Sequence, residues 1–199
     1  ITPKEKRTIA YHEAGHASVS WLLEHANPLV KVTIVPRGQA LGAAWYLPEE
    51  RQITTKAQLL DQMISLLGGR AAEEIVFGEV STGALNDLER VTKQAYAMVV
   101  YYGLDKEIGN ISFYDSSGQS EYGFQKPFSD KTAEKIDAQI RSMVEEAYNK
   151  AKAILTENRE KLDALATILV EREVIFREDV ENIYGKRPWD EEKTEKQQA

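Results

Sequence analysis

The chain has 199 residues, of which 42% are hydrophobic, a size and composition that allow one sizeable core or two small ones. Its net charge of -7, without a long basic run, argues against nucleic acid as a partner, because phosphate binding needs clustered lysine and arginine. The chain contains no cysteine, which excludes disulfide bonds and restricts any metal site to nitrogen and oxygen ligands.

The first predicted helix covers about residues 3–24. Thr2 can cap it, Pro3 suits its first position, and Glu5 completes a capping box with Thr2. The chain starts directly at this helix, without an initiator methionine or a signal peptide, and has no apolar run long enough to cross a bilayer. We therefore expect a soluble fragment of a longer protein.

Two β-rich runs follow, at residues 29–37 and 40–48, and predict two strands of a small sheet. The second run contains Gly42, Ala43 and Ala44. We expect it to be an edge on which an extended substrate peptide adds by main-chain hydrogen bonds, with Gly42 allowing close approach. The alternative is an ordinary strand without a binding role.

The rest of the chain predicts helices, and so a mainly α fold with a small β-sheet. Residues 55–77 carry apolar side chains at helical spacing, interrupted by a Gly68–Gly69 pair that indicates close approach of another backbone. A helix over residues 81–103 is expected to begin with Ser81 or Thr82 as its cap. Further helices are predicted at about 129–154, 157–171 and 177–184, after a polar loop at roughly 105–128. Residues 1–187 then form one domain, and the polar residues 188–199 are predicted to be a disordered tail.

The sequence HEAGH, at residues 12–16 of the first helix, is the most informative motif. His12 and His16 are four residues apart, so they share one face of the helix and can direct both imidazoles at one zinc ion. Glu13 lies about 100° further round the helix, where it suits a base that acts on a metal-bound water. The alternative is two ordinary histidines and a surface glutamate, but a chain with 3 histidines would seldom place them in this pattern by chance.

A third ligand must come from elsewhere in the chain. His25, the remaining histidine, lies about 180° round the helix from His16 and cannot join the pair. Glu73 is one candidate, because it follows the glycine pair, and Asp87 is another, because it lies near a helix N-terminus beside an apolar stripe. Each also has a plain alternative role, in an ion pair with Arg70 or in an interaction with the helix dipole. The residues alone leave the two candidates even.

Four segments carry a resemblance to a known family: YHEAGHA, KVTIVPRGQALGAAWYLP, GGRAAEEIVFGEVSTGALNDLERVT and EIGNISF. Together they resemble the peptidase domain of the FtsH family of membrane-anchored AAA zinc metalloproteases, whose relatives include paraplegin-type mitochondrial proteases. The resemblance covers about residues 1–187 and implies a zincin-type helical peptidase domain. It also implies that Asp87 is the third zinc ligand and that Glu73 orients a ligand.

The implied activity is that of a zinc metalloendopeptidase with one zinc per chain. Glu13 would take a proton from the zinc-bound water that attacks the peptide carbonyl. The alternative, from a different class of function, is an idle scaffold whose zinc and helices hold a hexameric ring together. An idle relative would have no need of the base at Glu13, so the residue favours the protease.

The resemblance also implies partners and a location. The substrates would be unfolded or membrane proteins, and the full-length protein would be a homohexamer with an AAA ATPase module and a membrane anchor N-terminal to this segment. The chain has no GxxxxGK[ST] motif, so ATP would act only through that module. The expected location is the cytoplasmic side of a bacterial inner membrane, and the alternative is the mitochondrial inner membrane.

Overall fold

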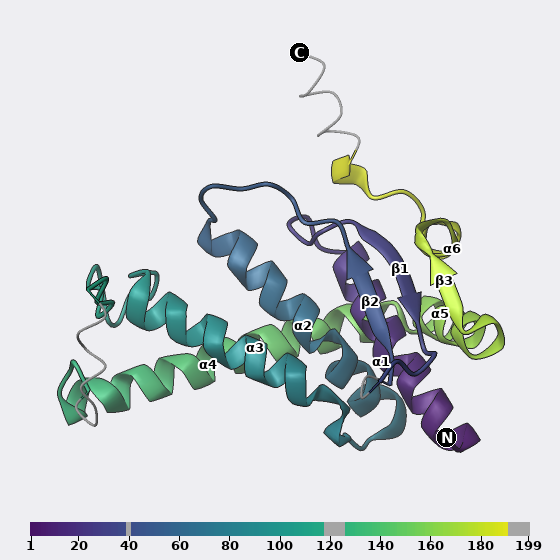
Figure 1. Ribbon diagram of the computed structural model, residues 1–199, viewed down its shortest axis with the longest axis horizontal. Coiled ribbons are helices and arrows are strands. Elements are labelled where there is room, and N and C mark those ends of the chain that lie inside the picture. Colours follow the sequence, from purple (N-terminus) through teal and green to yellow (C-terminus); the bar gives the residue numbers. More distant parts are fainter. Residues whose placement is uncertain (39–40, 118–125, 191–199) are drawn as a thin grey trace, which may run out of the picture.

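A computed structural model describes residues 1–38, 41–117 and 126–190, and in these ranges the chain forms six α-helices and a small antiparallel sheet (Figure 1). The elements in chain order are α1 (Pro3–Trp21), β1 (Leu29–Thr33), β2 (Ala43–Tyr46), α2 (Lys56–Phe77), the 3-10 turn η1 (Thr82–Ala84), α3 (Leu85–Tyr96), the π-helical η2 (Ala97–Tyr101), α4 (Asp130–Glu157), α5 (Arg159–Arg172), β3 (Val174–Phe176) and α6 (Arg177–Tyr184). The predicted mainly α fold with a small sheet is confirmed.

Helix α1 is the central element of the fold. Thr2 and Glu5 form the predicted capping box, in which the Glu5 amide donates to Thr2 Oγ1 at 3.2 Å and the Thr2 amide donates to Glu5 Oε2 at 2.8 Å. Every residue from Ala10 to Trp21 is buried, because α1 packs against α2, α5 and the sheet on different sides. The helix ends at Trp21, three residues before the predicted end at residue 24.

At Gly15 and Gly68 the backbones of α1 and α2 come into direct contact. A β-carbon built on Gly15 would lie 2.4 Å from the carbonyl oxygen of Gly68, and one built on Gly68 would lie 2.8 Å from that of Gly15. The glycine pair therefore serves the close approach that the sequence indicated. The prediction that this pair interrupts the helix is wrong, because α2 runs unbroken from Lys56 to Phe77.

The sheet has the strand order β2-β1-β3, with β2 at one edge. Both neighbours of β1 are antiparallel to it, so that Val32 lies opposite Ala44 on one side and Ile175 on the other. The two predicted strands are shorter than expected, and β3 was not predicted. Helix α5 ends just before Glu173, whose positive φ of 67° turns the chain directly into β3.

The remaining helices form the rest of the core. Helix α2 packs against α1 on one side and α4 on the other, and α3 runs beside α4 away from the sheet (Figure 1). The helix predicted over 81–103 is instead three consecutive segments, η1, α3 and η2. The largest completely buried apolar side chains come from α2, η2, α4 and α5: Met63, Leu67, Met98, Leu155, Leu162, Leu165 and Leu169.

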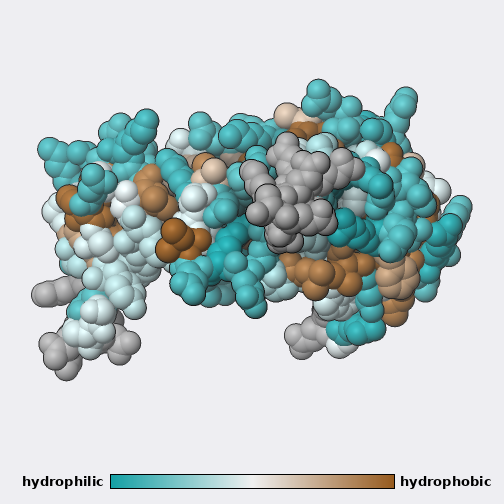
Figure 2. All heavy atoms as spheres, turned by 90° about the horizontal axis from the view of Figure 1, so that it is seen from above, coloured by the Kyte–Doolittle hydropathy of each residue, from teal (hydrophilic) through white to brown (hydrophobic). Residues whose placement is uncertain are grey.

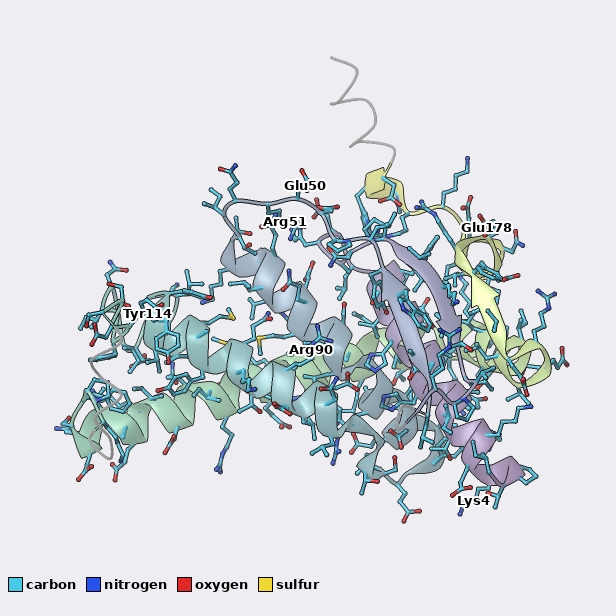
Figure 3. All side chains as sticks on the ribbon, in the orientation of Figure 1. Lys4, Glu50, Arg51, Arg90, Tyr114 and Glu178 are labelled. Carbon is cyan, nitrogen blue, oxygen red and sulfur yellow. The ribbon has the colours of Figure 1, made fainter. Side chains whose placement is uncertain are left out.

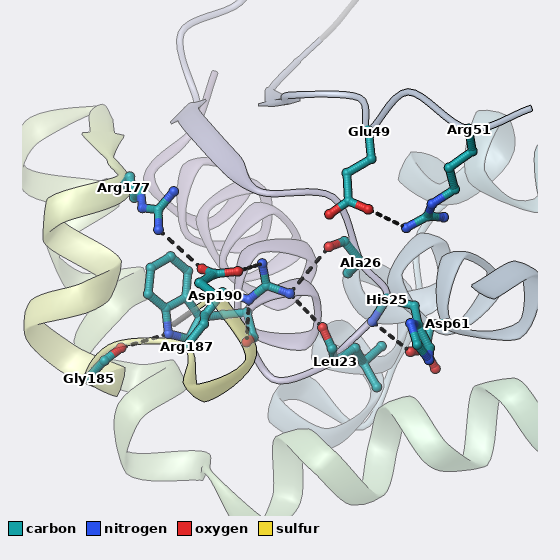
Figure 4. Close-up of polar contacts among 11 residues, drawn as sticks. Leu23, His25, Ala26, Glu49, Arg51, Asp61, Arg177, Gly185, Arg187 and Asp190 are labelled. Atoms are coloured by element: carbon teal, nitrogen blue, oxygen red, sulfur yellow. Dashed lines mark hydrogen bonds and ion pairs between the residues drawn. The ribbon is translucent and has the colours of Figure 1, made fainter. Parts of the chain in front are cut away.

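The C-terminal segment closes over the end of α1 (Figure 4). Arg187, only 3% exposed, donates to the carbonyl oxygens of Trp21 at 3.2 Å, Leu23 at 2.7 Å and Ala26 at 3.3 Å. It also donates to Asp190 at 3.2 Å. The contact with Trp21 satisfies a carbonyl group at the end of α1, and the other two carbonyls belong to the turn that follows it. Residues 188–190, the first of the predicted tail, lie within the described ranges, and the rest of that predicted tail lies outside them.

Most charged side chains lie on the outside of the molecule. Lys4 and Glu178 point away from the body in Figure 3, and Figure 2 shows a largely hydrophilic surface with small hydrophobic patches. No helix within the described ranges is both long enough and apolar enough to cross a membrane. Among the residues that the structure describes, three acids are buried, Glu13, Glu73 and Asp105, and the first two lie beside the histidine pair.

Candidate metal centre

Three potential ligand atoms converge where α1 meets the first turn of α3. His12 Nε2 lies 3.1 Å from His16 Nε2 and 3.2 Å from Asp87 Oδ2, and His16 Nε2 lies 3.1 Å from the same Asp87 oxygen. The two imidazole rings stand at 74° to each other with their centroids 4.8 Å apart. Within the described part of the chain, these three residues form the group that could hold a metal ion.

The second nitrogen of each ring is held by an acceptor. His16 Nδ1 donates to the backbone carbonyl of Ser65 at 2.9 Å, and His12 Nδ1 donates to Glu73 Oε2 at 2.8 Å. With both Nδ1 atoms donating, the Nε2 lone pairs of the neutral rings and the Asp87 oxygen point at one another. Such an arrangement needs a cation or a proton among the three atoms.

The donor set and its spacing fit zinc. Nitrogen and oxygen ligands about 2.0 Å from a tetrahedral zinc ion lie about 3.3 Å apart. The separations of 3.1–3.2 Å between the three ligand atoms are close to that value. Three ligands also leave one tetrahedral position for a water or a substrate, as in catalytic rather than structural zinc sites.

Electrostatics also favour a cation here. Burial opposes a charge on His12, but the hydrogen bonds with Asp87 and Glu73 outweigh burial and raise the pKa of His12 to about 10. Burial likewise opposes the charge on Asp87, and the contacts with both histidines outweigh it and lower the pKa of Asp87. The carboxylates therefore draw a positive charge into the cluster, and a bound metal ion would take the place of the proton on His12.

Glu73 lies behind His12 and not among the three converging atoms. Its side chain is 1% exposed, and its two oxygens accept from His12 Nδ1 and from the Ser81 hydroxyl. Burial would raise the pKa of Glu73, but the hydrogen bonds from His12 and Ser81 lower it, so the group is a carboxylate. A carboxylate at this place fixes which nitrogen of His12 carries the proton and how the ring is turned.

Glu13 lies on the side of α1 that faces the beginning of β2. Its residue is 8% exposed, and burial raises its pKa above the ordinary value for glutamate. A β-carbon built on Gly42 would lie 3.0 Å from Glu13 Cγ and 3.1 Å from Glu13 Oε1. Gly42 therefore touches Glu13, and the partly buried Ala43 and Ala44 continue from it along the edge strand β2.

Other parts of the structure bear on the sequence predictions. His25 lies away from the centre, where its amide donates to Asp61 at 3.1 Å and its ring lies 3.7 Å from Glu24. Sequence reasoning missed the carbonyl of Ser65, which no side-chain pattern can reveal. It noted Ser81 only as a possible helix cap, and the contact with Glu73 had no signal in the sequence.

An HExxH helix whose histidines meet a carboxylate from a second helix defines a zinc metallopeptidase of the zincin type. The sequence matches the profile described as Peptidase family M41 over residues 1–183. The chain therefore belongs to peptidase family M41, the peptidase domain of FtsH-type ATP-dependent zinc metalloproteases.

Individual relatives agree with this family. The chain is 64% identical over 188 residues to the ATP-dependent zinc metalloprotease FtsH of Parabacteroides distasonis, a match that covers 94% of this chain and 27% of that protein. It is 52% identical to the FtsH of Karelsulcia muelleri, covering 92% of this chain and 29% of that protein. It is 47% identical to the mouse mitochondrial inner membrane m-AAA protease component AFG3L2, covering 98% of this chain and 24% of that protein. The predicted kinship with FtsH and mitochondrial AAA proteases is confirmed, and the chain spans about a quarter of the length of these relatives.

Proposed function

We propose that this chain is the proteolytic domain of an ATP-dependent, membrane-anchored protease and that it hydrolyses peptide bonds of unfolded or membrane proteins. One zinc per chain is held by His12, His16 and Asp87. The observation that carries the proposal is the convergence of three ligand atoms at 3.1–3.2 Å from one another. When bound, zinc supplies a Lewis acid that polarises the peptide carbonyl and lowers the pKa of a coordinated water.

Glu13 is the general base of the proposed reaction. Its burial raises its pKa, which makes the carboxylate a better proton acceptor than an exposed glutamate. It takes a proton from the attacking water and returns it to the nitrogen of the leaving amine. Glu73 supports the reaction indirectly, because it holds the ring of His12.

The substrate binds along the edge of the sheet in this proposal. Strand β2 pairs with β1 on one side, and at the other side it ends the sheet. A peptide that adds to this edge as a further strand would form main-chain hydrogen bonds with the segment of Gly42, Ala43 and Ala44. The contact between Gly42 and Glu13 supports the proposal, because it brings the beginning of this edge to the base.

The assembly around this domain is inferred from its kinship. Relatives that are named ATP-dependent proteases are about three and a half times as long as this chain, which leaves room for the AAA ATPase module and a membrane anchor N-terminal to the domain. ATP acts through that module, and the protein forms a homohexamer. The identity of 64% to a bacterial relative, against 47% to a mitochondrial one, favours the cytoplasmic side of a bacterial inner membrane.

The proposal is tested by Glu13→Gln in the full-length protein, with ATP and fluorescein-labelled casein as an unfolded substrate. Loss of the base should lower the cleavage rate by about 100-fold or more, while zinc content stays at the wild-type level. Glu24→Gln, at an exposed position just after the same helix, is the matched control and should cleave normally. If Glu13→Gln cleaved as fast as wild type, the proposed mechanism would be wrong and the idle scaffold would become the better description.

A further inference from the structure

The hydroxyl of Ser81 connects the segment that leads into α3 with the buried carboxylate of Glu73. Ser81 Oγ donates to Glu73 Oε1, and the backbone amide of Gly83 donates to Ser81 Oγ at 3.1 Å. Because the N–H of Gly83 is the donor in this contact, it must point at a lone pair of the Ser81 oxygen, and the single hydrogen of the hydroxyl stays available for another acceptor. The proton of Ser81 is thereby directed at Glu73.

Glu73 has a different partner on each oxygen. Oε1 accepts from Ser81 and Oε2 accepts from His12 Nδ1 at 2.8 Å. The terminal torsion of a glutamate side chain has a broad energy minimum, so a carboxylate held by one oxygen can still turn. The contact with Ser81 restricts that freedom and helps to position the oxygen to which His12 donates.

The two histidines differ in how their acceptors are held. His16 donates to the carbonyl of Ser65, which the backbone of α2 itself keeps in place. His12 donates to a side chain, which must be oriented by something else. Gly69 confines the His12 ring, because a β-carbon there would lie 2.5 Å from Nε2, but it provides no acceptor for Nδ1.

We infer that Ser81 is a positioning residue of the metal centre, which acts on His12 through Glu73. The inference rests on the zinc site proposed above. Ser81 also caps the turn η1 by accepting a hydrogen bond from Gly83. A residue that only caps the turn would affect the stability of the fold but not its zinc affinity. The two roles therefore lead to different measurements.

The first test is zinc affinity, measured on the full-length protein by competition with a chromogenic chelator. Ser81→Ala should weaken zinc binding by about 10-fold, the lower end of the range for residues that support a ligating histidine. Ser81→Thr retains the hydroxyl and should restore the affinity to near the wild-type value. Thr82→Ala removes a neighbouring exposed hydroxyl in the same turn and should leave zinc affinity unchanged.

The second test is the same substitution in a Glu73→Ala background. If Ser81 acts through Glu73, Ser81→Ala should cause no further loss of zinc affinity there, whereas an independent effect would give the same 10-fold loss again. The inference is overturned by that additive loss, or by a Ser81→Ala variant that has a lower melting temperature but wild-type zinc affinity. If the proposed zinc site itself were wrong, His16→Ala would bind zinc as tightly as wild type, a result that separates this case from failure of the Ser81 inference alone.

Discussion

A side chain at residue 42 would crowd Glu13, the proposed base. A β-carbon on Gly42 would lie 3.0–3.1 Å from Glu13 and from Ile9 Cγ2, where ordinary van der Waals contacts begin at 3.4 Å. The sequence assigned Gly42 to the substrate edge. The structure adds a second role, because the absence of a side chain there leaves Glu13 in its place.

We predict that Gly42→Ala lowers kcat by about 10-fold, since a small displacement of a catalytic group is costly. KM and zinc content should change little, because the β-carbon pushes on Glu13 and not on the ligands. Steady-state cleavage of a labelled peptide, with zinc measured by mass spectrometry, checks this. A raised KM with an unchanged kcat would instead assign Gly42 to substrate binding alone.

Local spacing alone predicts part of the proposed centre. His12, Glu13 and His16 share one helix, so their relative positions follow from its period. The residues alone could not decide whether Asp87 or Glu73 is the third ligand, because the position of each carboxylate depends on how α2 and α3 pack against α1. Only the resemblance ranked Asp87 first, and the folded chain brings that carboxylate to both Nε2 atoms.

At the scale of elements, the close contact between α1 and α2 determines which groups of α2 reach the two histidines. Gly15 lies between His12 and His16 in the sequence, and it touches the backbone of α2 at Gly68. This close approach allows the carbonyl of Ser65 to reach His16 and Glu73 to reach His12. The small residues of the HEAGH motif are therefore part of the architecture of the centre.

We predict that Gly15→Ala destabilises the domain by about 1–3 kcal/mol, because overpacking forces the helices apart. In an open helix the same change would stabilise by about 1 kcal/mol. Urea unfolding measures the difference, and Asn149→Ala, at an exposed position in α4, is a control expected to be nearly neutral. A variant as stable as wild type would show that the backbone contact is not tight in solution.

Caps and periodicity predicted most helices, but not the features that depend on distant partners. The capping box of α1 is local, and it formed as expected. The end of α1 is not local, because Arg187 binds the carbonyls of Trp21 and of the residues after it from more than 160 positions away. Strand β3 has three residues and exists through pairing with β1, so its sequence alone carries little signal.

At the scale of the whole molecule, the metal centre joins parts of the chain that are far apart in sequence. The proposed ligands come from α1 and α3, the groups that hold the two histidines come from α2, and Ser81, just before η1, contacts Glu73. Asp87 is half-buried in the first turn of α3, and its contacts with both histidines tie that helix to α1. A bound ion is thus expected to stabilise the packing of these helices as well as to supply chemistry.

We therefore predict that removal of zinc by a chelator lowers the melting temperature by about 5–10 °C. A ligand present at 100 times its Kd stabilises the folded state by about 2.7 kcal/mol, and each kcal/mol shifts Tm by about 2–4 °C in a domain of this size. Asp87→Ala should contain little zinc, against about one per chain in wild type, and its Tm should not respond to the chelator. Glu89→Ala, at an exposed acid on the same helix that pairs with Lys93 at 2.7 Å, should behave as wild type. If Asp87→Ala retained its zinc and its response to the chelator, the third ligand would have to be another group, and Glu73, already bonded to His12, would be the next to test.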